Sequence, residues 1–108
     1  MDKPINKSNT FNTALPAIGA DLLAADLTAT RDPGVFRIYA CISVAGVLSI
    51  ARTVGATTVT EALNSGAALV AGAGYMFTVP VKAGEAYNFT YSATGGNISK
   101  LQIDEAWS

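Results

Sequence analysis

Hydrophobic and polar residues alternate along most of this chain with a period of two, the pattern of a strand that has one face in a core. The alternation is clearest over residues 35–44 and returns at 75–81, 87–91 and 101–107. In the first stretch the residues predicted to face the core are Phe36, Ile38, Ala40, Ile42 and Val44. In the last stretch Leu101, Ile103 and Trp107 are predicted to point inward, with Lys100, Gln102 and Asp104 opposite. The pattern predicts short strands along most of the chain.

Turn-forming residues separate these stretches at regular intervals. Arg31-Asp32-Pro33-Gly34 is the clearest turn, and Ala45-Gly46 and 82–85 are predicted to close two hairpins, joining 35–44 to 47–53 and 75–81 to 87–91. The β-branched run 57–60 predicts another short strand. Pro80 lacks a backbone N–H, so its strand is expected to lie at a sheet edge or to bend at a bulge.

Seven or eight short strands within 108 residues predict an all-β fold, a two-sheet antiparallel sandwich. Jelly-roll and immunoglobulin-like topologies both fit. Residues 14–27 fit a helix, and residues 23–30 fit a first strand instead. Residues 1–13 are mostly polar and hold too few apolar groups to fold back on a core. We therefore expect an extended N-terminal arm over residues 1–20, laid across another subunit, and one sandwich domain over residues 21–108.

Charge is sparse in this chain. Only 14% of the residues are charged and the formal net charge is -1, whereas an average soluble domain has about 25% charged residues. Little self-repulsion keeps copies of such a chain apart. The composition therefore predicts a homo-oligomeric subunit that is packed against its neighbours.

Candidate chemistry is largely absent from the sequence. There is no His, and the single cysteine, Cys41, is predicted to be a small buried hydrophobic residue. Neighbours on a strand point to opposite faces, so Asp104 and Glu105 are not expected to share a substrate, and both are interpreted as solvated edge charges. We expect no catalytic residues, no metal, no cofactor and no enzymatic activity.

Nucleic acid, a membrane span and a secretion signal are all excluded on the sequence. No basic cluster suits nucleic acid. The uncharged stretch 38–51 is too short to span a bilayer as a helix, and 62–81 contains glycines and Pro80 that would break one. No apolar run of signal-peptide length occurs near the N-terminus.

The chain resembles the small β-sandwich structural proteins of phage and virus particles, which decorate or cement a capsid. The resemblance covers Leu22 to Trp107 as a pattern of segments rather than as a diagnostic motif. The segments are Pro33-Gly34, Leu63-Asn64-Ser65-Gly66 followed by Ala68-Leu69, Tyr75-Met76-Phe77, and Gly84 to Tyr91. The resemblance implies a homo-oligomer, often around a threefold axis as in a trimer, that binds a capsid lattice and is located in the virion after synthesis in the host cytoplasm.

Six residues are the candidate interface residues: Pro4, Ile5, Phe11, Tyr39, Pro80 and Trp107. The first three are apolar residues of the predicted arm. A tyrosine on a polar face, an edge proline and a terminal tryptophan are places where a sandwich can meet a neighbour. Two alternatives stay open: a carbohydrate-binding spike or adhesin domain in which Tyr39 and Trp107 stack on sugars, and an extracellular filament or surface-layer subunit joined by strand donation.

Overall fold

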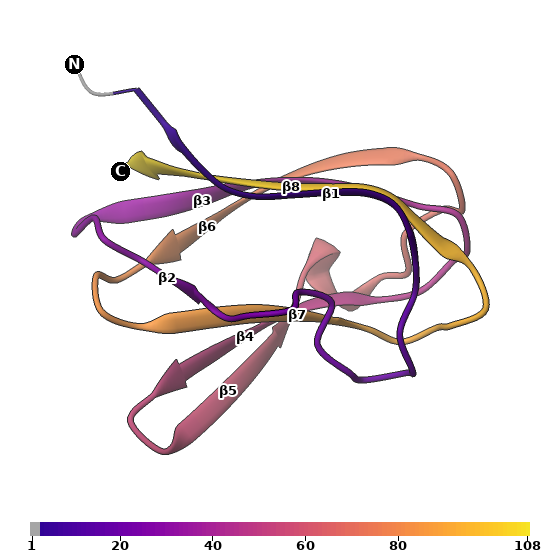
Figure 1. Cartoon of the computed structure of the whole chain (residues 1–108), viewed down its shortest axis with the longest axis horizontal. Coiled ribbons are helices and arrows are strands. Elements are labelled where there is room, and N and C mark those ends of the chain that lie inside the picture. The colour runs from indigo at the N-terminus through magenta and orange to yellow at the C-terminus, as the bar shows by residue number, and fades with distance from the viewer. Residues whose placement is uncertain (1–2) are drawn as a thin grey trace.

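The computed structural model describes residues 3–108, which form two four-stranded antiparallel sheets packed face to face (Figure 1). The first sheet has the order β1 (Ile5–Ala14), β8 (Asn97–Trp107), β3 (Gly34–Ile42) and β6 (Gly74–Val81). The second has the order β2 (Leu27–Thr28), β7 (Ala86–Tyr91), β4 (Leu48–Val54) and β5 (Thr57–Ala62). One turn of 3-10 helix, η1 (Asn64–Gly66), follows β5. The predicted all-β sandwich is confirmed.

The strand pairs follow a simple rule. Strand β1 pairs with β8, β2 with β7, β3 with β6 and β4 with β5, as if one long hairpin had been folded at the β4–β5 turn and then rolled up. Rolling adds the contacts of β3 with β8 and of β4 with β7. This is the strand order of a jelly roll, so the topology that the sequence left open is decided.

Two predicted hairpins are wrong for the same reason. Strands β3 and β4 lie in different sheets, and so do β6 and β7, so the turns at 45–46 and 82–85 carry the chain from one sheet to the other. Only β4 and β5 are both consecutive and paired. Their two-residue turn has Gly55 at its first position with φ +61°, which fits a type II′ turn.

The core lies between the two sheets and is built from the alternation read in the sequence. Its fully buried large apolar side chains are Phe36, Ile38, Ile42, Leu48, Leu69, Tyr87, Phe89, Ile98, Leu101 and Ile103. Phe36 and Tyr87 meet across the sheets edge to face, with ring centroids 5.1 Å apart. The predicted core faces of β3, β7 and β8 are confirmed, except at Trp107, which is 48% exposed.

The N-terminal segment differs from the expected arm. Residues 5–14 form β1, an edge strand that pairs with β8 of the same chain along its whole length. The reason is that β8 pairs with β3 on one side, and β1 satisfies the backbone N–H and C=O groups on its other side. The first two residues of the predicted arm, Met1 and Asp2, lie outside the described residues.

The segment between β1 and β2 is not the helix that its sequence allowed, and the alternative first strand over residues 23–30 is present only in part. Leu15, Leu22 and Leu23 are buried from irregular backbone, and only Leu27–Thr28 pairs as β2. A groove of about 470 Å³ separates this segment from β1, with Ser8, Thr10 and Thr13 on the β1 side. Among residues 3–108 no helix has the length and hydropathy needed to cross a bilayer.

Candidate functional site

The outer face of the first sheet, which is the side away from the core, holds a mixed set of charged, polar, aromatic and apolar side chains. The register aligns Met76, Tyr39, Gln102 and Asn9 in one row across β6, β3, β8 and β1. Thr78, Arg37, Asp104 and Asn6 form the row on one side of it. Gly74, Cys41, Lys100 and Phe11 form the row on the other side.

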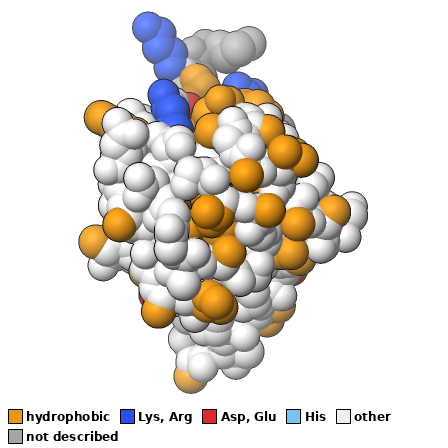
Figure 2. Space-filling view, turned by 90° about the vertical axis from the view of Figure 1, so that its right-hand side faces the viewer, with side chains coloured by type: hydrophobic (Ala, Val, Ile, Leu, Met, Phe, Trp, Pro, Cys, Tyr) orange, Lys and Arg blue, Asp and Glu red, His pale blue; other side chains and the backbone are white. Residues whose placement is uncertain are grey.

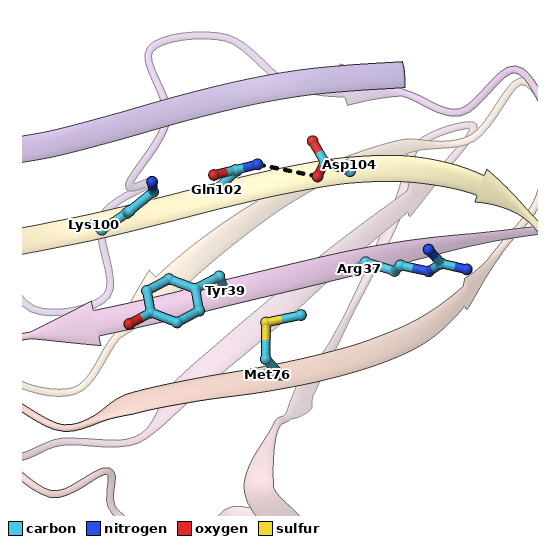
Figure 3. A pocket seen from close by; sticks show the side chains of 6 residues that line it. All are labelled: Arg37, Tyr39, Met76, Lys100, Gln102 and Asp104. Atoms are coloured by element: carbon cyan, nitrogen blue, oxygen red, sulfur yellow. Dashed lines mark hydrogen bonds between the residues drawn. The ribbon is translucent and has the colours of Figure 1, made fainter. Parts of the chain in front are cut away.

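Tyr39 lies at the centre of this face in an open hollow of about 490 Å³ (Figure 3). Its ring reaches across β6 at Gly74, where an added Cβ would lie 3.0 Å from the ring carbon that carries the hydroxyl. Glycine at position 74 therefore leaves room for the ring to rest against the sheet. Met76, which is 66% exposed, borders the same hollow.

The charged groups of the hollow differ in their hydrogen-bond partners. The carboxylate of Asp104 accepts a hydrogen bond from the Gln102 amide at 3.1 Å (Figure 3) and another from the Asn6 amide at 2.9 Å. The side chains of Arg37 and Lys100 make no hydrogen bond or ion pair with any of residues 3–108. The hollow thus combines an aromatic ring, a thioether and two cationic groups.

The six candidate interface residues fall into two places. Phe11, 60% exposed, Tyr39 and Pro80 lie on the outer face of the first sheet. Pro80 lies in β6, which pairs with β3 alone among the described strands, so the predicted edge position is confirmed. The carbonyl of Pro80 accepts a hydrogen bond from Arg52 at 2.8 Å, which ties β6 to β4 of the other sheet.

The other three residues lie at one end of β1 and β8. Pro4 precedes β1 and is exposed, and Ile5, 44% exposed, is opposite Glu105. Trp107 ends β8 beneath the guanidinium of Arg31, which lies 5.2 Å from the centre of its ring. The structure therefore places Phe11, Tyr39 and Pro80 on one face of the first sheet, and Pro4, Ile5 and Trp107 at one end of β1 and β8.

A buried polar network occupies this end of the sandwich. Glu105 has no exposed surface and accepts hydrogen bonds from the Thr30 and Arg31 backbone N–H groups and from the Thr30 hydroxyl, at 2.8 to 3.0 Å. Lys7 lies 3.5 Å from the same carboxylate. Arg31 donates to the carbonyls of Glu105 and Lys3, so it joins β8 to the segment that leads into β1.

The prediction that Glu105 is a solvated edge charge is therefore wrong. The side chain of Glu105 lies on the same inward face of β8 as Leu101 and Ile103. Its burial is tolerated because four groups compensate its charge. Burial alone would raise the pKa of Glu105, but the hydrogen bonds from Thr30 and Arg31 and the charge of Lys7 hold the pKa below its ordinary value.

Cys41 also differs from its prediction. It is half-buried on the outer face of the first sheet, and its thiol donates to the carbonyl of Gly72 at 3.5 Å, so it is not a core residue. Its alternation partners, Arg37 and Tyr39, already placed it on that face. Among residues 3–108 no three His, Cys, Asp or Glu side chains gather in a way that could hold a metal ion.

Exposed apolar side chains are spread over the molecule. The large ones are Ile5, Phe11, Ile18, Val54, Val59, Val70, Met76 and Trp107. Figure 2 shows one end of the sandwich, where hydrophobic groups are scattered over an uncharged surface and Lys and Arg appear only at its upper rim. Ile5, Phe11 and Trp107 were candidate interface residues. The other five were not, although Met76 and Val59 lie in strands that the sequence predicts.

No protein-family model, curated protein or solved structure matches this chain.

Proposed function

We propose that this chain is a non-enzymatic structural subunit that assembles with copies of itself into a larger particle, with a virion as the location and a capsid decoration, cement or minor structural role. The observation that carries the proposal is an exposed surface with many apolar side chains and few charges. Among residues 3–108 eight large apolar side chains are exposed, in a chain that has only 15 charged residues, seven basic and eight acidic. Burying such groups against a neighbouring copy stabilises both subunits at about 25 cal/mol for each Å² of apolar surface removed from water.

The fold adds support by analogy. Two-sheet jelly rolls occur in viral capsid proteins and in lectins, so this topology raises the expectation for a capsid role without deciding it. In this proposal the N-terminal segment is part of the domain and not a free arm. Residues 5–14 act as an edge strand of the domain, and its exposed residues Ile5 and Phe11 are contact residues.

The test is the mass of the purified chain in solution. Sedimentation-velocity and light-scattering measurements over a wide dilution series are expected to show a discrete oligomer that dissociates on dilution. A stable monomer at every concentration, with no tendency to associate, would contradict the proposal. If the oligomer forms, binding to particles that lack this subunit tests the capsid role separately.

A second candidate function, carbohydrate binding, is favoured by one specific observation. The ring of Tyr39 rests against the sheet over Gly74, in a hollow that Arg37, Lys100 and Gln102 also line. An aromatic ring with polar side chains around it suits stacking against a sugar. Arg37 and Lys100 outnumber the one carboxylate of the hollow, Asp104, which is already hydrogen-bonded to Asn6 and Gln102, so the hollow favours sugars that carry carboxylates.

A glycan array tests this candidate. Wild-type protein is expected to retain acidic glycans, and Tyr39→Ala to lose that signal because the stacking surface is gone. Thr78→Ala is the matched control, since Thr78 is exposed on the same face next to Arg37 and does not line the hollow. Absence of any signal from the wild type contradicts carbohydrate binding and leaves the assembly proposal intact.

A further inference from the structure

The four edge strands of this sandwich differ in how far they are protected against pairing with another chain. An edge strand presents unpaired N–H and C=O groups, and native proteins blunt such edges with bulges, inward charges, prolines or short length. Strand β1 has a bulge between Asn6 and Ser8, and its Lys7 reaches inward to Glu105. Strand β6 contains Pro80, and β2 is two residues long.

Strand β5 has none of these devices. Its six residues pair with β4 in an unbroken register, and its sequence contains no proline and a single charged residue, Glu61. All six residues are exposed, so both faces of the strand as well as its edge are open to solvent. Figure 1 shows the β4–β5 hairpin diverging from the sheet that contains β3 and β6.

The direction of the free backbone groups follows from the hairpin. Hydrogen-bonded and non-hydrogen-bonded pairs alternate along antiparallel strands, and the Leu63 N–H donates to the Leu48 carbonyl at 2.8 Å. By this alternation Thr57, Val59 and Glu61 direct their backbone groups to β4. The other three residues, Thr58, Thr60 and Ala62, direct theirs outward to the open edge.

We infer that β5 pairs antiparallel with β5 of a second copy of this chain, across a twofold axis through Thr60. The inference rests on the proposed function, of which it names one interface. This register places Thr60 opposite Thr60 and Thr58 opposite Ala62, so all three outward residues are used in about six backbone hydrogen bonds. It sets Glu61 opposite Val59, so the two carboxylates are not opposed.

A second copy is the occupant because the strand is complementary to itself. Registers centred on Thr58 or Ala62 run off one end of the strand, and a register centred on Glu61 places like charges face to face. Pairing joins the β2-β7-β4-β5 sheet of one copy to the same sheet of the second copy, so that one continuous sheet crosses the interface. A twofold contact of this kind also covers β5 completely and leaves no edge for a further copy.

Disulfide trapping tests the register. In a Cys41→Ser background, Thr60→Cys is expected to form a covalent dimer under mild oxidation, because hydrogen-bonded antiparallel partners have Cα atoms about 5.5 Å apart, which suits a disulfide. Thr58→Cys is the matched control. It is exposed and on the same face, but its partner is Ala62, so the two cysteines are too far apart to join.

Thr60→Pro tests the energetics. The Thr60 N–H points outward, so proline is expected to leave the subunit folded, with an unchanged circular dichroism spectrum, and to weaken dimerisation about tenfold or more. Thr60→Val keeps the N–H and is expected to dimerise like the wild type.

The outcomes separate the two proposals. A wild-type oligomer that Thr60→Pro does not weaken, together with no Thr60→Cys crosslink, overturns the β5 interface and leaves the assembly proposal standing. Equal crosslinking of Thr58→Cys and Thr60→Cys also overturns the stated register. A wild-type chain that is monomeric at all concentrations overturns both proposals.

Discussion

Glu105 is the residue whose ionisation contributes most plainly to the stability of the folded chain. Its carboxylate is the common acceptor for Thr30, Arg31 and the charge of Lys7. These contacts join three segments that are remote in the sequence: the start of β1, the turn before β3 and the end of β8. The loss of this one charge is therefore expected to loosen the whole end of the sandwich.

We expect Glu105→Gln to lower the free energy of unfolding by about 2 to 3 kcal/mol at neutral pH, because three hydrogen bonds to a charged acceptor are weakened. Asp104→Asn is the matched control, since Asp104 is next in the chain but only half-buried and bonded to two neutral amides. It is expected to cost less than about 1 kcal/mol. Urea denaturation followed by fluorescence measures both, and equal losses would contradict the role given to Glu105.

The pH dependence of the same variant has a definite sign. The pKa of Glu105 is lower in the folded chain than its ordinary value of 4.5, so the charged form is favoured by folding. The resulting stabilisation is complete above that ordinary value and is lost as the pH falls through the folded pKa. The difference in stability between wild type and Glu105→Gln is therefore expected to narrow below pH 4.5, as measured by urea denaturation at a series of pH values. A difference that widens in acid would contradict this sign.

Strand β1 is the element whose role differs most between sequence and structure. A free arm could be removed without affecting the fold, whereas β1 completes the first sheet and carries Lys7 to Glu105. Deletion of residues 2–14 is therefore expected to destabilise the subunit itself, with a large fall in melting temperature or loss of soluble protein. The edge of β8 would then be open along its length.

Complementation by a peptide of residues 2–14 sharpens this prediction. The peptide is expected to restore the melting temperature of the shortened chain, and a scrambled peptide of the same composition is not. If the shortened chain melts like the wild type and only loses its ability to assemble, the original arm interpretation is correct and β1 is dispensable for folding.

The strands themselves were largely predictable, but their partners were not. Alternation reports which side of a strand meets a core, so β3, β7 and β8 were identified with their faces. It does not report which strand lies alongside, and in a rolled hairpin only β4 and β5 are both neighbours in sequence and partners in the sheet. The turns at 45–46 and 82–85 therefore looked like hairpins, although they cross between sheets.

The candidate site was also only partly predictable, because its neighbouring residues come from strands that are remote in the sequence. Tyr39 was identified as a residue on a polar face, but its neighbour Met76 comes from β6 and meets it only through the β3–β6 register. Glu105 could have been placed correctly, because it shares the parity of Leu101 and Ile103, but its charge was given more weight than its position. The partners that make its burial tolerable, Thr30 and Lys7, are more than seventy residues away in the sequence.

At the scale of the whole molecule, the sparse charge determines what kind of force can hold copies together. Seven basic and eight acidic residues cannot supply a strongly complementary charged interface, and the Lys7–Glu105 pair is internal. The groups that are available are backbone groups on β5 and apolar side chains such as Phe11 and Met76. Sodium chloride screens exposed ion pairs but has little effect on backbone hydrogen bonds, whereas sulfate salts strengthen the burial of apolar surface.

We therefore expect the association constant to change less than about threefold between low and high sodium chloride, because few ion pairs are there to be screened. Sodium sulfate, which strengthens the burial of apolar surface, is expected to favour the oligomer.

Because association stabilises the folded state, the melting temperature should also rise with protein concentration. Thr60→Pro supplies the control, since a subunit that cannot pair through β5 should lose most of that concentration dependence. Dissociation by sodium chloride in sedimentation equilibrium would instead show that charged groups hold the copies together.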